Sequence, residues 1–222
     1  MTPLQHADPV ALFLVLLALA ALPFAAMVVT SYTKISIVLG LLRNAIGVQQ
    51  VPPNMVLNGV AIIISCYIMA PVFIEATKGM SAASSASGGG GSSTQTLMEA
   101  ANSAREPFRK FLDKHAEERE KQFFLKSAAI IWPADQAAAL KKDDLIVLAP
   151  AFLLSELTAA FRIGFLLYLA FIVIDIVIAN VLLAMGLSQV TPTNVAIPFK
   201  LLLFVTMDGW SRLVHGLVLT YR

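Results

Sequence analysis

Four long apolar runs constrain the fold more than any other feature of the sequence. They cover residues 10–29, 56–74, 145–187 and 195–221. The first has no charged residue over twenty positions, and a helix of that length matches a hydrocarbon layer about 30 Å thick. With 58% hydrophobic and only 14% charged residues, the chain has the composition of a membrane protein. We therefore predict an all-α fold of membrane-type helical hairpins with four main hydrophobic segments.

The segment between the second and third runs is polar. Residues 75–144 carry ten basic and ten acidic side chains, too many to enter lipid. Within them, residues 81–96 are rich in serine and glycine and predict a flexible tether. Residues 96–126 mix both charge signs with apolar residues at helical spacing, which predicts an amphipathic helix with a solvated face. The predicted parts are a hydrophobic hairpin (1–74), a helical aqueous domain, and a second hydrophobic hairpin (145–222).

The loop at residues 30–54 orients the chain. Its only charges are Lys34 and Arg43, and basic loops favour the cytoplasmic side. The aqueous domain and both termini are then predicted on the periplasmic side. Residues 1–9 contain no lysine or arginine, which favours retention of the first run over cleavage as a signal peptide.

Among the charged residues in the last two apolar runs, we single out five: Glu156, Arg162, Asp175, Lys200 and Asp208. A charge in an apolar segment is costly unless a partner or water offsets it. Lys200 and Asp208 lie eight residues apart on one predicted helix, so about 12 Å separates them and each needs a partner from another segment. We expect interhelical or intersubunit ion pairs that fix helix register. A proton or ion relay is the alternative.

The sequence offers no catalytic grouping. His6, His115 and His215 lie in different regions, and the HExxH, GxSxG and phosphate-loop motifs are absent. The single cysteine, Cys66, allows neither an intrachain disulfide nor a cysteine metal cluster. A net charge of +2 without a long basic run argues against nucleic acid as a partner. We predict that the protein is not an enzyme and uses no cofactor or metal.

Four stretches carry a family resemblance. They are TSYTKISIVLGLLRNAIGVQQVPPN, ELTAAFRIGF, DIVIANVLLAMGL and IPFKLLLFVTMDGW. In order and spacing they closely resemble the SctR/FliP family of inner-membrane export-apparatus proteins, found in bacterial type III secretion systems and in the flagellum. The resemblance covers about two-thirds of the chain. The start without basic residues is more similar to the virulence-associated branch than to the flagellar one.

The resemblance implies an all-helical subunit of a homopentamer, joined by the small subunits S and T and by other inner-membrane export-apparatus proteins. The implied place is the bacterial inner membrane, multi-pass and within the secretion-system basal body, largely above the membrane plane once assembled. The implied function is an export gate for unfolded secreted proteins. An ion-coupled secondary transporter, motivated by Asp175 and the two hairpins, is the alternative. A membrane-anchored adaptor acting through residues 95–126 is a third interpretation.

The resemblance also implies site residues. The family closes its channel with a methionine-rich loop between the last two helices, which falls here near residues 185–194. Its core is Met185, Gly186, Leu187, Ser188, Gln189 and Val190. Only one methionine is present, so we expect Leu187 and Val190, or partner subunits, to contribute to the seal. Glu156 and Phe161 match a stretch that the family uses for ring formation. With them, Arg162, Asp175, Lys200 and Asp208 are expected at contacts between subunits.

Overall fold

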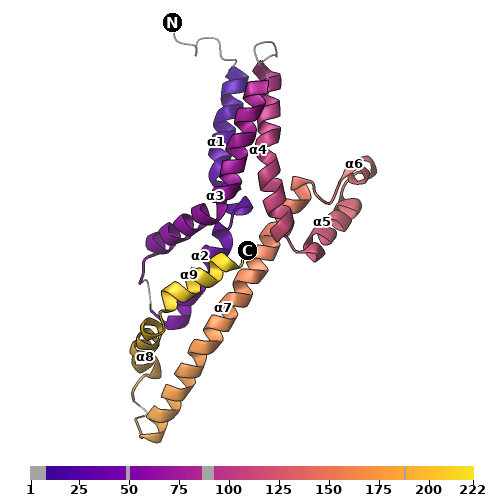
Figure 1. The fold of residues 1–222 in the computed structure, drawn as a ribbon. Coiled ribbons are helices and arrows are strands. Elements are labelled where there is room, and N and C mark those ends of the chain that lie inside the picture. The colour runs from indigo at the N-terminus through magenta and orange to yellow at the C-terminus, as the bar shows by residue number, and fades with distance from the viewer. Residues whose placement is uncertain (1–8, 49–50, 87–92, 188) are drawn as a thin grey trace.

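The structure, a computed structural model, describes residues 9–48, 51–86, 93–187 and 189–222. Within those ranges the chain is helical and contains no strand, which confirms the predicted all-α class. The helices, labelled in Figure 1, are α1 (Pro9–Val29), α2 (Tyr32–Ile46), α3 (Asn54–Ala86), α4 (Ser93–His115), α5 (Glu118–Ile131), α6 (Ala134–Ala139), α7 (Leu145–Ala184), α8 (Pro192–Thr206) and α9 (Gly209–Leu219).

The long helix α7 runs diagonally along the molecule and supports most of the other elements (Figure 1). α2 packs along α7 and also against α3. α3 pairs with α4 to form a stalk at one end of the molecule, and α5 and α6 project to the side. At the opposite end α8 folds back beside α7, and α9 returns toward the centre. The α7–α8 hairpin is therefore held at its base and extends away from the stalk.

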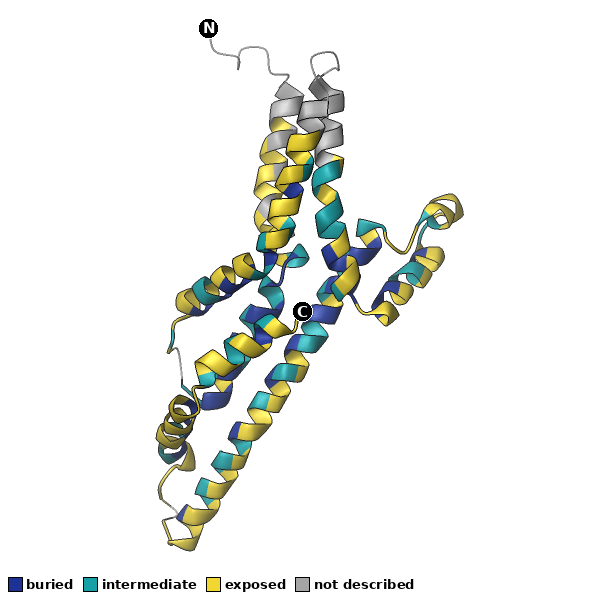
Figure 2. Ribbon diagram, in the orientation of Figure 1, coloured by how far each residue is buried: buried dark blue, intermediate teal, exposed yellow. Residues whose placement is uncertain are grey.

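Buried side chains gather around α2 and the first half of α7 (Figure 2). On α2 they recur every three or four residues, the period that places them on one helical face. They contribute to three apolar clusters, centred on Leu39, Phe152 and Leu42. In contrast, most side chains in the second half of α7 and on α8 and α9 are exposed. These outer faces leave a large apolar surface without a partner in the single chain.

Two helices in the described residues are long and apolar enough to cross a membrane. They are α3, over Asn54–Ala82, and α7. α8 and α9 add a third if the bent pair counts as one span. The predicted first run forms α1, of whose side chains the structure describes only part.

α7 is one continuous helix over Leu145–Ala184. Its 40 residues extend about 60 Å. Gly164 lies where α7 meets α2, and a Cβ atom there would lie 2.2 Å from Leu41 Cδ1. This glycine permits the close approach of the two helices without ending α7.

The predicted tether at residues 81–96 is helical at both of its ends. α3 continues through its Ala/Ser-rich end to Ala86, and α4 begins at Ser93; residues 87–92 lie outside the described residues. α3 and α4 run side by side and pack tightly. A Cβ atom added to Gly79 on α3 would lie only 3.1 Å from the Ser103 carbonyl oxygen on α4. The small side chain of Gly79 permits this close approach of α3 and α4.

The predicted single helix through Lys200 and Asp208 is also wrong. α8 ends at Thr206, and α9 leaves at an angle of 63°. Asp208 adopts a left-handed backbone conformation, with φ 52°. A Cβ atom added to Gly209 would lie only 2.2 Å from Cε2 of the Phe204 ring. The ring also packs edge-on against Trp210, at 5.4 Å between centroids. Aromatic packing across a glycine therefore stabilises a bend that hydropathy does not reveal.

We predict that Gly164→Leu destabilises the fold by about 1 to 3 kcal/mol, because the added side chain overpacks the α2–α7 contact. Thermal unfolding of the purified protein measures the change. The matched control is Gly59→Leu in α3, where no atom lies within 4 Å of the added Cβ. Equal melting temperatures for the two variants would contradict the close α2–α7 approach.

Candidate assembly and gating sites

A buried ion pair joins the two hydrophobic halves of the chain. Lys34 on α2 and Glu156 on α7 lie 3.0 Å apart, Nζ to Oε1, and their side chains are 5% and 4% exposed. The Tyr221 hydroxyl donates to the second carboxylate oxygen, Oε2. The Lys34 ammonium also lies 3.7 Å from the centre of the Tyr221 ring, a cation–π contact. Both charges are thus satisfied without solvent.

Polar and aromatic groups extend this cluster toward the aqueous domain. Ser155, next to Glu156, donates to the Ala151 carbonyl and accepts from the Glu117 N–H, at 2.7 and 2.8 Å. The His115 ring lies 5.2 Å from the Tyr221 ring, between centroids. α2, α4, α7 and the segment after α9 therefore meet at one point, and the loop before α5 is fixed to it.

Burial lowers the pKa of His115 to about 4 from its ordinary 6.5, with nearby Lys114 and Lys34 adding to the effect. The imidazole is therefore neutral at pH 7. Its role at this point is packing against the rings of Phe111 and Tyr221.

A second ion pair crosses from α8 to α7. Lys200 Nζ lies 2.7 Å from Asp175 Oδ2 and also donates to the Ala45 carbonyl of α2, at 3.1 Å. The Lys200 side chain is buried, while that of Asp175 is partly exposed. Asp175 Oδ1 is itself buried and has no hydrogen-bond partner among the described residues. The pair holds the α7–α8 hairpin against α2 and leaves one acceptor for a donor from outside the chain.

The structure separates the six predicted assembly residues into two groups. Glu156, Asp175 and Lys200 have ion-pair partners within the chain. Within the chain, Lys200 therefore has the interhelical partner that one alternative expects, and its place at a contact between subunits stays a prediction. Arg162 and Asp208 have no ion pair within the described part of the chain, and Phe161 is exposed. A role for these three between subunits stays a prediction.

Lys34 and Tyr221 are the residues that sequence reasoning missed. In the sequence, Lys34 indicates only which side of the membrane the loop at residues 30–54 faces. In the structure it lies on the otherwise apolar, buried face of α2, with Ile35 and Val38. A lysine at such a position predicts a buried acidic partner. Tyr221 gave no signal, because its contact depends on how α9 returns toward α2.

The predicted gating loop forms the exposed tip of the α7–α8 hairpin. α7 ends in a Schellman motif, in which the Leu187 N–H bonds to the Leu182 carbonyl and the Gly186 N–H to the Leu183 carbonyl, both at 3.0 Å. Gly186 supplies the positive φ, 73°, that this motif requires. Met185 is 66% exposed, and Leu187, Gln189 and Val190 are also exposed. Ser188 lies outside the described residues.

We predict strong coupling between Lys34 and Glu156. Lys34→Met or Glu156→Leu alone should cost about 3 to 5 kcal/mol, because each leaves one buried charge unpaired. The double variant should cost much less than the sum, since it removes both charges. Denaturant unfolding of all four proteins measures this cycle. For comparison, Lys142→Met breaks a half-exposed pair with Glu118 and should cost under about 1 kcal/mol. Additive effects at Lys34 and Glu156 would contradict the pair.

We also predict that stability falls as the pH drops from 6.5 toward 4. In that window the unfolded His115 binds a proton that the folded one does not, so stability rises with pH. The loss from pH 7 to 5 should be about 1 kcal/mol, because water screens part of the effect at a half-buried group. Melting curves of His115→Gln should lose this component, and those of the exposed-site control His215→Gln should keep it. Parallel curves for wild type and His115→Gln would rule the effect out.

Comparison with known proteins confirms the resemblance seen in the sequence. The chain matches the FliP family over residues 14–217. It is 65% identical to the hypersensitivity response secretion protein HrcR of Ralstonia nicotianae, across 99% of this chain and 100% of that protein. It is 48% identical to Yop proteins translocation protein R of Yersinia pestis, across 98% and 99%. It is 39% identical to virulence protein YscR of Salmonella typhimurium, across 96% and 97%. The family match and these near-complete alignments together show that the chain belongs to the FliP family.

Proposed function

We propose that the protein is an export-gate subunit of a type III secretion apparatus, forming with further copies a channel for unfolded proteins across the bacterial inner membrane. The observation that carries this proposal is family membership over nearly the whole chain, with relatives whose names refer to secretion, translocation and virulence. The virulence-associated branch fits these relatives better than the flagellar one.

The unpartnered apolar surface supports an oligomeric role. Exposed large side chains follow one another along α7 from its middle toward the hairpin tip: Phe161, Phe165, Leu166, Leu169, Val173 and Ile176. A soluble monomer rarely leaves such a surface uncovered. A ring of copies, proposed here as a homopentamer with the small subunits S and T, would cover it. Exposed Arg162, Asp208 and Phe161 would then lie where copies meet, and Asp175 Oδ1 would accept from a neighbour.

The shape of the α7–α8 hairpin supports a gating role. Its base is fixed by the Lys200–Asp175 pair, whereas its tip presents Met185, Leu187 and Val190 to the outside. In a ring these apolar tips would converge and exclude water, and a threading polypeptide would displace them. The unbranched thioether of Met185 suits contact with irregular chains. The subunit itself performs no catalysis, and other components supply the driving energy.

The ion-coupled transporter alternative rests on Asp175, as an intramembrane charge, and on the two hairpins. The ion pair with Lys200, whose ammonium also donates to the Ala45 carbonyl, gives Asp175 a structural role. We therefore propose the gate and not the transporter.

We predict that a photo-crosslinking amino acid at Val190 captures a secretion substrate stalled during export, because the hairpin tip lines the passage. The same amino acid at Ile130, which is 85% exposed on α5, is the matched control and should capture none. Immunoblotting of the crosslinked substrate, with secretion measured in the same cells, provides the readout.

Two results would count against the gate. One is equal substrate capture at positions 190 and 130. The other is a chain that remains a solitary monomer after mild extraction from secreting cells while secretion continues.

A further inference from the structure

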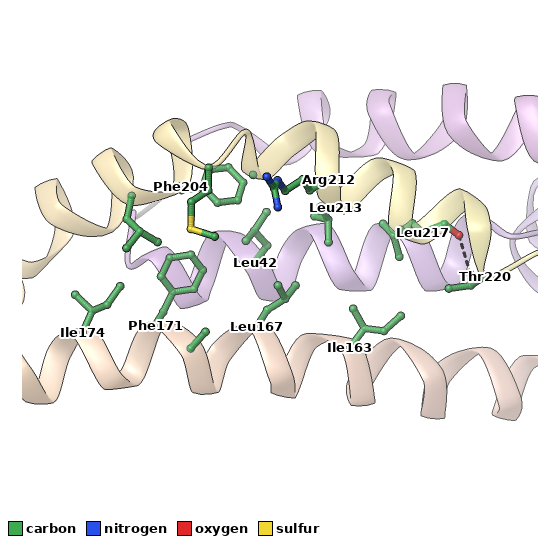
Figure 3. Close-up of a pocket in the computed structure, with 15 residues that line it drawn as sticks. Leu42, Ile163, Leu167, Phe171, Ile174, Phe204, Arg212, Leu213, Leu217 and Thr220 are labelled. Carbon is green, nitrogen blue, oxygen red and sulfur yellow. Dashed lines mark hydrogen bonds between the residues drawn. The ribbon is translucent and has the colours of Figure 1, made fainter.

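Arg162 stands in an exposed apolar face of α7. Leu166 and Leu169 lie one and two turns after it on the same side of the helix, and all three side chains are exposed. Figure 3 shows that the residues next to them, Ile163 and Leu167, point instead toward α2 and α9. Arg162 has no ion pair with any residue that the structure describes. We call this surface the basic α7 face.

Covering the basic α7 face requires an anion for Arg162. A charge enclosed by apolar surface is costly unless an opposite charge accompanies it. The second hydrophobic half, residues 145–222, contains three acidic side chains, Glu156, Asp175 and Asp208. The first two already form ion pairs with lysines of the same chain. Asp208 is therefore the acid of this half that is left to pair with Arg162.

Asp208 also adjoins an exposed apolar face. It follows the end of α8, where Leu201 and Val205 lie one turn apart and are exposed. Its own side chain is exposed and makes no capping hydrogen bond to α9. Arg212 lies one turn later, yet the two form no ion pair in the described part of the chain. We call the surface of Leu201, Val205 and Asp208 the acidic α8 face.

The two charges lie at similar levels along α7. The Phe204 ring packs against the Phe171 ring, at 6.4 Å between centroids, so the end of α8 lies beside a point about 14 Å along α7 from Arg162. α8 runs back toward the centre of the molecule (Figure 1), and Asp208, one turn further on, is closer still to the level of Arg162. Copies related by rotation about an axis along the hairpin keep each residue at its level. Such a rotation can therefore bring the two charges of neighbouring copies together.

We propose that the basic α7 face of one copy packs against the acidic α8 face of the next, with Arg162 paired to Asp208. This contact rests on the proposed function, because it supplies the lateral interface of the ring. It is head-to-tail, since each copy turns a different face to each neighbour, and contacts of this type can close into rings. Two basic α7 faces would set arginine against arginine, so the charges also exclude the wrong pairing of faces.

Charge reversal tests the contact in the full chain, produced together with the rest of the secretion apparatus. Arg162→Glu and Asp208→Arg should each lower the amount of ring-sized complex in mild detergent extracts several-fold, because like charges then meet. The double variant should restore the complex, because every contact again joins opposite charges. Normal assembly of both single variants, or a double variant no better than either one, would overturn the pairing.

The matched control reverses a cation elsewhere. Lys78 is exposed on α3 and has no ion pair among the described residues. Lys78→Glu should leave the amount of complex unchanged, and it should not restore assembly when combined with Asp208→Arg. Restoration by Lys78→Glu would show that net charge, and not the contact, controls assembly, and would overturn the pairing.

A crosslinking measurement keeps the proposal testable if a reversed charge prevents folding. Two differently tagged copies, both with the exposed Cys66 replaced by alanine, carry Arg162→Cys and Asp208→Cys respectively. A short bismaleimide should join them into a dimer that contains both tags. The combination of Lys78→Cys with Asp208→Cys is the control and should give no such dimer.

The outcomes separate this contact from the gate itself. Assembled copies without a crosslink between positions 162 and 208 would overturn the contact and leave the gate proposal standing. Crosslinks from both cysteines to another apparatus subunit, and none between copies, would assign these faces to that subunit and overturn the contact as well. Copies that remain solitary in secreting cells would count against both proposals.

Discussion

The buried contact between the Lys34 ammonium and the Glu156 carboxylate is the constraint on which the rest of the structure depends. It links residues 122 positions apart in the chain, one from each hydrophobic half. Taking two charges out of water is expensive, so the pair is favourable only when both find good geometry. Tyr221 completes that geometry by donating to the carboxylate and by placing its ring beside the ammonium. The segment after α9 must therefore return to the centre before the charges are satisfied.

This arrangement divides the molecule into a fixed centre and a less constrained end. The centre combines the ion pair with the apolar clusters around Leu39 and Phe152. The outer end is held by the Lys200–Asp175 pair and the apolar cluster around Leu42, and beyond them the hairpin is largely exposed. Local opening is easiest where few buried contacts oppose it. The gate that we propose requires this distribution, because its moving part must change shape while its frame does not.

The sequence predicted the helical class and the positions of the apolar runs because long uncharged stretches leave few alternatives. It also showed that Lys200 needed a partner from another segment. It did not show that Asp175 was the partner, since two residues on different helices meet only through the hairpin geometry. The bend at Asp208 was missed because its cause is the packing of Phe204 over Gly209, a contact without a hydropathy signal. The extra helix at 81–86 was missed because serine and alanine are compatible with both a linker and a tight helix pair.

The Schellman motif at the end of α7 has a consequence for how the hairpin tip can vary between related proteins. The turn is made by main-chain hydrogen bonds and by a glycine at position 186. Its shape consequently does not depend on which side chains stand at 185, 187 or 190. Those positions can exchange a soft, adaptable lining for a stiffer aliphatic one over evolutionary time while the backbone path is preserved. A tip with a single methionine fits this backbone, and in the proposed gate the lining can differ while the scaffold stays the same.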